Sequence, residues 1–177
     1  MRTRFSTALG LPVIDDDTGE PLGALNGILL NPDTGKVEGF FIKIPGFLSS
    51  TMLFLSSFDV LHWGMRVAIR GMEVLSPLED HIRLQTMADE GRYFLGQRIV
   101  TDTGRYLGVC KDVQFDTDQF MVEWFWPKKF WKWQSPLPLT QIQEVRKEAI
   151  IVRDPSIRLA EKTSIKTSLI NQLPDAA

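Results

Sequence analysis

One sequence pattern occurs twice in this chain, and the repeat constrains the possible folds more than any other feature. The first copy runs from Gly10 to Leu30 as G-L-P-V-I-D-D-D-T-G-E-P-L-G-A-L-N-G-I-L-L, and the second from Gly96 to Phe115 as G-Q-R-I-V-T-D-T-G-R-Y-L-G-V-C-K-D-V-Q-F. The matched pairs are Gly19 with Gly104, Leu22 with Leu107, Gly23 with Gly108, Ile28 with Val113, Leu30 with Phe115, Val37 with Val122, Glu38 with Glu123 and Phe40 with Phe125. A repeat of this length predicts two copies of one small domain.

The composition is typical of a soluble globular protein. Of the 177 residues, 44% are hydrophobic and 24% are charged, and the net charge of −2 gives no overall basic field for nucleic acid or anionic lipid. Cys110 is the only cysteine, so no intrachain disulfide forms, and the N-terminal residues M-R-T-R-F-S-T lack the apolar core of a signal peptide. The uncharged stretch between Lys43 and Asp59 has 15 residues, fewer than the roughly 20 of a spanning helix. These features predict a protein that is cytoplasmic, with a peripheral position at the membrane as the other option.

Turn signals separate short runs of β-branched and aromatic residues, which predicts a β-rich fold. The turns are D-D-D-T-G, N-P-D-T-G, D-T-G and D-T-D, and glycines inside the runs indicate the bulges and bends with which small barrels close. We expect strands at Pro21 to Leu30, Val37 to Ile44, Met52 to Phe58 and Met65 to Ile69, and in the second copy at Leu107 to Phe115, Gln119 to Trp126, Leu137 to Ile142 and Ala149 to Val152. Many short strands at close spacing favour an all-β barrel or sandwich.

The repeat divides the chain into four segments. We predict a first barrel at 1–76, a connector at 77–92, a second barrel at 93–153 and a polar C-terminal tail at 154–177. Within the connector, Leu84 to Glu90 favours a short helix that Gly91 ends. The tail lies outside the repeat and is either disordered or a short docking helix.

The repeated pattern resembles the PRC-barrel family. The pattern is G-x-x-V, a D-x-x-G turn, L-G followed by alternating apolar residues, an acidic turn and the strand V-E-G-F-F-I. The first copy also has L-F-L-S-S-F-D-V-L and V-A-I-R-G, and the second has L-G-x-x-x-D-V and E-A-I-I-V, with one residue deleted before Gly104. Barrels of this family occur in the H subunit of photosynthetic reaction centres and at the C-terminus of the ribosome maturation factor RimM. The resemblance implies two small antiparallel β-barrels in tandem that act as interaction modules.

Three D-T-G triplets, at Asp17, Asp33 and Asp102, invite comparison with aspartic proteases, where paired D-T-G loops carry the catalytic aspartates. Here a charged residue follows each triplet, and Asp, Thr and Gly are favoured in hairpin turns. We therefore predict three exposed turns and no catalytic dyad.

Other polar clusters also lack the spacing of a site. The acidic run Asp15, Asp16, Asp17 and Glu20 lacks the EF-hand spacing for Ca²⁺, and His62 and His81 lack zinc-ligand spacing. Cys110 falls inside a strand, where a cysteine is usually a small core residue. The sequence predicts no catalytic, metal or cofactor site, and hence no enzyme.

The segment W-F-W-P-K-K-F-W-K-W, from Trp124 to Trp133, has an exceptional composition. Six of its ten residues are aromatic, three are lysine, and it holds four of the five tryptophans. We expect Phe120, Val122, Trp124 and Trp126 to share one face of a strand, and a loop to follow Pro127. Large aromatic side chains in a loop require something to cover them, which is either the other barrel, a partner protein or a membrane.

The same hairpin of the first copy contains P-G-F-L-S-S-T-M, so pseudo-two-fold packing would bring both apolar loops to one interface or surface. The predicted partner-binding residues are Phe47, Leu48, Lys128, Lys129, Phe130, Trp131, Lys132 and Trp133. The favoured function is a non-enzymatic adaptor for a partner protein or a membrane-associated complex. The alternatives are an RNA-binding or ribosome-assembly factor, in which the aromatic rings stack on bases, and a homodimer.

Overall fold

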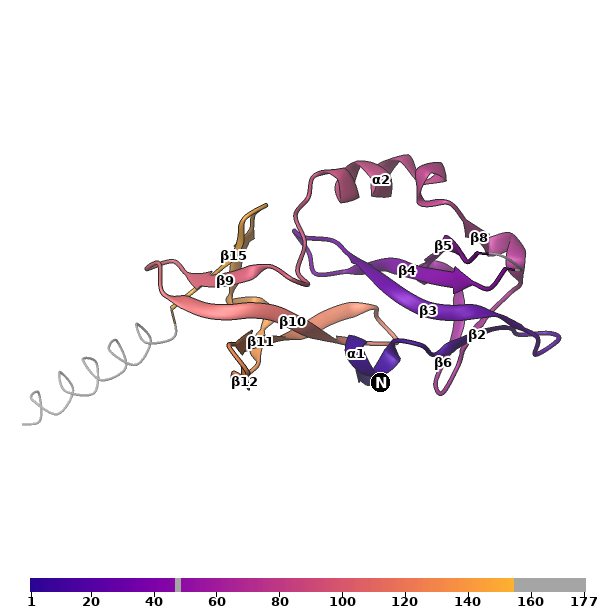
Figure 1. Ribbon diagram of the computed structural model, residues 1–177, viewed down its shortest axis with the longest axis horizontal. Helices are drawn as coiled ribbons and strands as arrows, with labels where there is room; N and C mark the ends of the chain where they lie inside the picture. The colour runs from indigo at the N-terminus through magenta and orange to yellow at the C-terminus, as the bar shows by residue number, and fades with distance from the viewer. Residues whose placement is uncertain (47–48, 155–177) are drawn as a thin grey trace, which may run out of the picture.

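The computed structural model describes residues 1–46 and 49–154, and its fold is mostly β. The strands form two sheets, one of which is a half-barrel. The sheets lie side by side, and helix α2 (Ile82–Asp89) runs across the outer side of one of them (Figure 1). Of the predicted tail at 154–177, only Asp154 is described, and it is buried and forms an ion pair with Arg105. Residues 155–177 lie outside the described residues.

The elements follow the turn signals of the sequence. In spatial order the strands of the first sheet are β6 (Val60–Trp63), β7 (Val67–Ile69), β2 (Pro12–Asp15), β3 (Pro21–Leu30), β4 (Val37–Ile44), β5 (Thr51–Ser56) and β8 (Leu75–Ser76). Those of the second are β14 (Ile142–Val145), β15 (Ala149–Val152), β9 (Arg98–Thr101), β10 (Tyr106–Asp116), β11 (Met121–Lys129) and β12 (Lys132–Trp133), with β13 (Leu137–Pro138) also beside β11 and β1 (Arg2–Arg4) beside β10. The helices besides α2 are α1 (Phe5–Ala8) and the 3-10 turns η1 (Ser57–Asp59), η2 (Met72–Val74), η3 (Leu78–Asp80) and η4 (Leu139–Gln141).

Two details correct the expectation of closed, purely antiparallel barrels. Each sheet contains one parallel pair, β2 with β7 and β9 with β15. The parallel pairs arise because η1 and η4 carry the chain onward into β6 and β14 without reversing its direction. In the described residues neither path of hydrogen-bonded strands returns to its first strand, so both sheets are open. The segment predicted as a strand at Leu137 to Ile142 is divided among β13, η4 and the first residue of β14.

The second sheet repeats the strand order of the first, with β14-β15-β9-β10-β11 corresponding to β6-β7-β2-β3-β4. Bulges interrupt the two long hairpins at matching places, between Leu25 and Gly27 and between Cys110 and Asp112. A Cβ atom at Gly23 would lie 2.8 Å from the Lys43 carbonyl oxygen, and one at Gly108 would lie 2.7 Å from the Lys128 carbonyl oxygen. Equivalent glycines thus allow equivalent strands to approach each other.

The chain start crosses from one half of the molecule to the other. Strand β1 pairs with β10 through Arg2 with Asp116, Thr3 with Phe115 and Arg4 with Gln114. Buried Asp112 then accepts hydrogen bonds from the Ser6 backbone N–H at 3.0 Å and from the Ser6 hydroxyl. The expected boundaries at 76, 92 and 153 remain predictions, but residues 2–4 contribute to the second sheet.

The two halves meet at the turns of their longest hairpins. The Val37 N–H donates to the Phe120 carbonyl at 2.7 Å, and the Val122 N–H donates to the Gly35 carbonyl at 2.9 Å. These two hydrogen bonds are related by the repeat register, so they form a local two-fold around the bridge between Lys36 and Met121.

Beneath this junction the aromatic rings of both halves pack together. Phe40 lies 5.0 Å from Trp63, 6.0 Å from Phe115 and 5.9 Å from Phe120, measured between ring centroids. The buried cluster continues from Val13 in the first sheet to Val152 in the second. A single hydrophobic core therefore spans both repeats.

Helix α2 covers the first sheet, close to the predicted connector helix. Its buried Leu84 packs with Leu29 and Phe54. Its Arg83 forms an ion pair with Glu38 of β4, whose carboxylate also accepts a hydrogen bond from Asn31 at 3.1 Å. Burial by itself would raise the pKa of Glu38, but the bonds from Arg83 and Asn31 outweigh it and hold the pKa below its ordinary value.

The matched glycines give a test of the repeat. We expect Gly23→Ala and Gly108→Ala each to lower the free energy of unfolding by about 1–3 kcal/mol, because a backbone carbonyl must move to admit the methyl group. Urea denaturation of the full chain measures this. Gly64→Ala is the control, since nothing lies within 4 Å of its Cβ position. Equal stability of all three variants would contradict the close strand approach.

The ion pair on α2 predicts a pH dependence. Because the Glu38 pKa is lower in the folded state, its stabilising contribution is present above the pKa of the unfolded chain and is lost as the pH falls through the folded value. Arg83→Gln should therefore cost about 1 kcal/mol at neutral pH, a modest value because the Arg83 side chain is exposed and screened. Urea denaturation across the acid range should show the difference from wild type shrinking. Arg66→Gln, in the β6–β7 turn, should show no such trend.

Candidate functional site

The Trp-rich segment forms a β-hairpin, which we call the aromatic hairpin (residues 121–133). Strand β11 extends through Pro127 to Lys129, and β12 returns after the two-residue turn Phe130-Trp131. The expectation of a loop after Pro127 is thus wrong. A proline fits here because the bulge between Cys110 and Asp112 lies opposite it, where the strand ladder is already interrupted.

The tip of the hairpin is highly exposed. Phe130 is 85% exposed, Trp131 77% and Trp133 50%. These rings are therefore not part of the protein's own core, which excludes the first of the three coverings considered from the sequence. Between the two tip residues and Gln134 lies a shallow depression with a mainly apolar lining.

The alternation expected along β11 is wrong for the residues after Val122, which include both Trp124 and Trp126. The strand register shifts between Gln114 and Phe115, so that Val122 and Phe125 both face the core and are almost fully buried. Trp124, at 36% exposure, faces outward instead of sharing the buried face with Val122. A bulge inserts one residue, and this exchanges the faces of all residues after it.

Backbone strain distinguishes the tip of the hairpin. In the described residues only Phe120 (φ 49°) and Phe130 (φ 53°) have a positive φ without being glycine. Phe120 packs 5.9 Å from Phe40 and 6.0 Å from Trp63, so core contacts offset the cost of its conformation. Phe130 occupies a turn position that usually requires glycine, and its side chain is in solvent. A strained backbone conformation costs about 1–3 kcal/mol, and one whose cost is not offset by packing contacts of the same residue is typical of functional sites.

Cations surround the base of the hairpin. The Lys128 ammonium lies 5.4 Å from the Trp133 ring, and the Lys129 ammonium donates to the Tyr106 carbonyl at 3.2 Å. Lys132, opposite Lys129, is exposed. All three predicted lysines are therefore brought together with the three exposed rings.

Arg4 is a member of this surface that the sequence did not suggest. Its guanidinium lies 4.3 Å from the Trp126 ring and 5.2 Å from the Trp133 ring, and its Nε donates to Asp112 at 2.8 Å. Arg4 reaches the hairpin because β1 pairs with β10. No short-range pattern links residue 4 to residue 133, so only the strand topology reveals this contact.

The other predicted site residues, Phe47 and Leu48, lie outside the described residues. Their hairpin joins β4 to β5, the position that corresponds to the aromatic hairpin in the repeat. The antiparallel bridge between Lys36 and Met121 means that β4 and β11 leave the junction in opposite directions, as Figure 1 also shows. The ends of these strands, Ile44 and Lys129, therefore do not meet at one interface within the chain.

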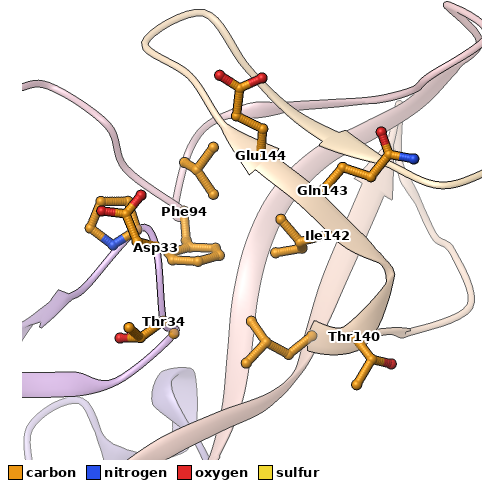
Figure 2. Close-up of a pocket in the computed structure, with 11 residues that line it drawn as sticks. Asp33, Thr34, Phe94, Thr140, Ile142, Gln143 and Glu144 are labelled. Carbon is orange, nitrogen blue, oxygen red and sulfur yellow. The ribbon is translucent and has the colours of Figure 1, made fainter.

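A separate pocket of about 340 Å³ lies between the halves, beside the junction (Figure 2). Its apolar lining includes Phe94 and Ile142, and the carboxylates of Asp33 and Glu144 lie at its rim (Figure 2). Arg92 forms an ion pair with Asp33, which lowers the pKa of that carboxyl group. None of the predicted partner-binding residues lines this pocket, and Asp33 belongs to the second D-T-G turn, which was predicted to be non-catalytic.

The three D-T-G aspartates occupy three different exposed turns, as predicted. Asp17 lies between β2 and β3, Asp33 between β3 and β4, and Asp102 between β9 and β10. Asp15 accepts hydrogen bonds from the Asp17 and Thr18 backbone N–H groups, both at 2.9 Å, as in a standard Asx turn.

The other chemically reactive side chains are used in packing. Cys110 is fully buried, and burial raises its thiol pKa to about 12, so the reactive thiolate is scarce at neutral pH. The His81 ring packs against Phe54 and hydrogen-bonds Ser76 at 2.8 Å. Within residues 1–46 and 49–154, no cluster of His, Cys, Asp and Glu gathers that could hold a metal ion. None of the described helices is long and apolar enough to span a membrane.

Comparison with known protein families identifies the family of the region that contains the first sheet. The PRC-barrel domain model matches residues 3–91, half of the chain. The chain belongs to the PRC-barrel family. The matched region covers the first sheet and α2 of this PRC-barrel protein and ends before β9. No curated protein matches the chain.

The strained turn of this PRC-barrel protein yields a prediction about stability. We expect Phe130→Gly to raise the free energy of unfolding by about 1 kcal/mol, because glycine adopts a positive φ without steric cost and the lost ring contacts only solvent. Phe120→Gly should instead destabilise the fold by about 2–4 kcal/mol, because it removes a ring packed in the aromatic cluster. Thermal unfolding of both variants measures the contrast. Destabilisation by Phe130→Gly comparable to that of Phe120→Gly would show that the tip ring is structural.

Proposed function

We propose that this protein is a non-enzymatic adaptor with two PRC-type barrels in tandem, which presents the aromatic hairpin to a partner protein or a membrane-associated complex. The family model covers only the first barrel. The assignment of the second rests on the equal strand order, the matching bulges and the equivalent close approaches of Gly23 and Gly108.

One observation carries the adaptor function. The two most exposed large rings of the second sheet, Phe130 and Trp131, form the turn of the β11–β12 hairpin. Phe130 and Trp131 lie between Lys129 and Lys132, which pair with each other across the hairpin. At the base of the hairpin, the Gln134 N–H donates a hydrogen bond to the Pro127 carbonyl at 2.9 Å. A rigid hairpin presents its rings at a small entropic cost on binding. Aromatic side chains in such positions commonly dominate the energy of an interface.

The alternative is binding of RNA, and one group of contacts favours it. Arg98 and Lys129 both lie over the Tyr106 ring, at 5.5 and 5.4 Å, so cations and rings alternate across the second sheet beyond the three predicted lysines. Such surfaces bind single-stranded nucleic acid by stacking and charge. The sequence pI of 5.7 is far below the value above 9 that is typical of nucleic-acid-binding domains, so the adaptor is preferred.

Photo-crosslinking in the native host tests the adaptor. A photoreactive phenylalanine analogue at position 131 should give a defined adduct, while the same analogue at position 58 serves as the control. Phe58 is a matched position because it is 78% exposed but lies on η1 of the first sheet. Adducts of the same kind and yield from both positions, or no adduct from position 131, would contradict the proposal. Sensitivity of the adduct to protease, ribonuclease or lipid extraction identifies the class of partner.

A further inference from the structure

We infer that the partner of the aromatic hairpin is an anionic membrane surface, into which Phe130 and Trp131 insert. The inference rests on the proposed function, because it names the partner of the same hairpin. Insertion is interfacial, with the rings among the headgroups and the rest of the chain in water. It requires no spanning segment.

The projecting position of the two tip rings favours a bilayer over a folded partner. The two most exposed rings of the hairpin lie on the turn itself, beyond the last ladder pair, so they project from the sheet. A folded partner must offer a preformed cavity that matches both rings. A fluid interface adapts to a projecting ring, and tryptophan is enriched at this depth of the bilayer because its ring is amphipathic.

The charge around the rings is complementary to anionic headgroups. Lys128, Lys129 and Lys132 flank the tip, and the sequence from Trp124 to Trp133 contains no acidic residue. The nearest acidic residue along the chain, Glu123, forms an ion pair with Arg2 at 2.7 Å. A basic cluster thus lies at the hairpin of a chain whose net charge is −2, and basic residues next to an apolar anchor attract anionic lipids.

The positions of the lysines also set the depth of insertion. The Lys128 ammonium lies against Trp133, and the Lys129 ammonium is bonded to the Tyr106 carbonyl, so both charges are held behind the tip. Lysine side chains in this position keep their charge at the headgroups while apolar side chains enter the interface. The structure therefore matches a shallow insertion of about 5–10 Å rather than a deeper one.

The arrangement of the other rings disfavours RNA as the partner of the tip. Arg4 covers Trp126 and also contacts Trp133, and Lys128 contacts Trp133 as well. Ring faces that already hold a cation are less available for stacking on bases, and the same holds for Tyr106 beneath Arg98 and Lys129. The two tip rings without such a contact follow each other in a tight turn, which offers no basic groove to guide a strand.

Vesicle binding of the purified full chain tests the inference. The probes are vesicles of phosphatidylcholine alone and vesicles in which phosphatidylglycerol replaces one third of it. We expect co-sedimentation with the anionic vesicles, weakened by salt, and a blue shift of the tryptophan emission. Phe130→Ser with Trp131→Ser should reduce the affinity by about tenfold or more, and Lys128→Gln, Lys129→Gln and Lys132→Gln together should remove the preference for phosphatidylglycerol.

Matched controls separate hairpin insertion from unspecific adsorption. Phe58→Ser and Met65→Ser remove side chains that are 78% and 92% exposed in the first sheet, and both should bind vesicles like wild type. Thermal unfolding should show that the hairpin variants remain folded, as expected for rings in solvent. Equal losses from control and hairpin variants would overturn the inference.

Other outcomes distinguish failure of this inference from failure of the adaptor. Absence of binding to anionic vesicles, combined with a crosslink from position 131 to a protein or to RNA, overturns the membrane partner and leaves a binding role for the hairpin. Self-association that depends on Trp131, seen by light scattering, assigns the hairpin to a second copy of the chain and also overturns it. Absence of vesicle binding together with absence of any crosslink overturns both proposals.

Discussion

Two backbone hydrogen bonds between hairpin turns, from Val37 to Phe120 and from Val122 to Gly35, fix the relation between the two halves. The repeat matches each residue of one bond with a residue of the other, so the two bonds are related by a local two-fold axis. This symmetry directs β4 and β11 away from each other. The same contact brings Phe40 and Phe120 together, so the two half-cores merge into one. The pocket at Phe94 and the outward direction of the aromatic hairpin both follow from this junction.

The sequence predicted the parts of the fold that depend on local chemistry. Strands at Pro21–Leu30, Val37–Ile44 and Ala149–Val152 have the expected bounds, because turn residues delimit them on both sides. The pairing of β1 with β10 was not predictable, since it joins residues far apart in the chain. The outward position of Trp124 was missed because a bulge at Glu123 inserts one residue into β11 and changes which face each later residue occupies, and no turn residue marks this position in the sequence.

For the candidate site, composition located the hairpin but not its conformation. The aromatic and lysine residues at 128–133 were recognisable because their clustering is unusual, and the structure gathers them on one hairpin. The contrast between Phe120 and Phe130 was not visible in the sequence. Both residues adopt nearly the same strained φ, but one ring lies against Phe40 and the other in solvent. Only this comparison separates a strained residue of the core from a strained residue of a surface.

The crossing of β1 has a consequence for how such a protein evolves. A tandem repeat normally permits loss, exchange or recombination of one unit, because each unit contains its own strands. Here the second sheet takes a strand, and the cation between Trp126 and Trp133, from the segment that precedes the first repeat. Removal of the first repeat together with that segment would take β1 from the side of β10 and the Arg4 and Ser6 bonds from Asp112. The two sheets therefore share a strand and a cation, so a deletion that removes the first sheet also takes away part of the second.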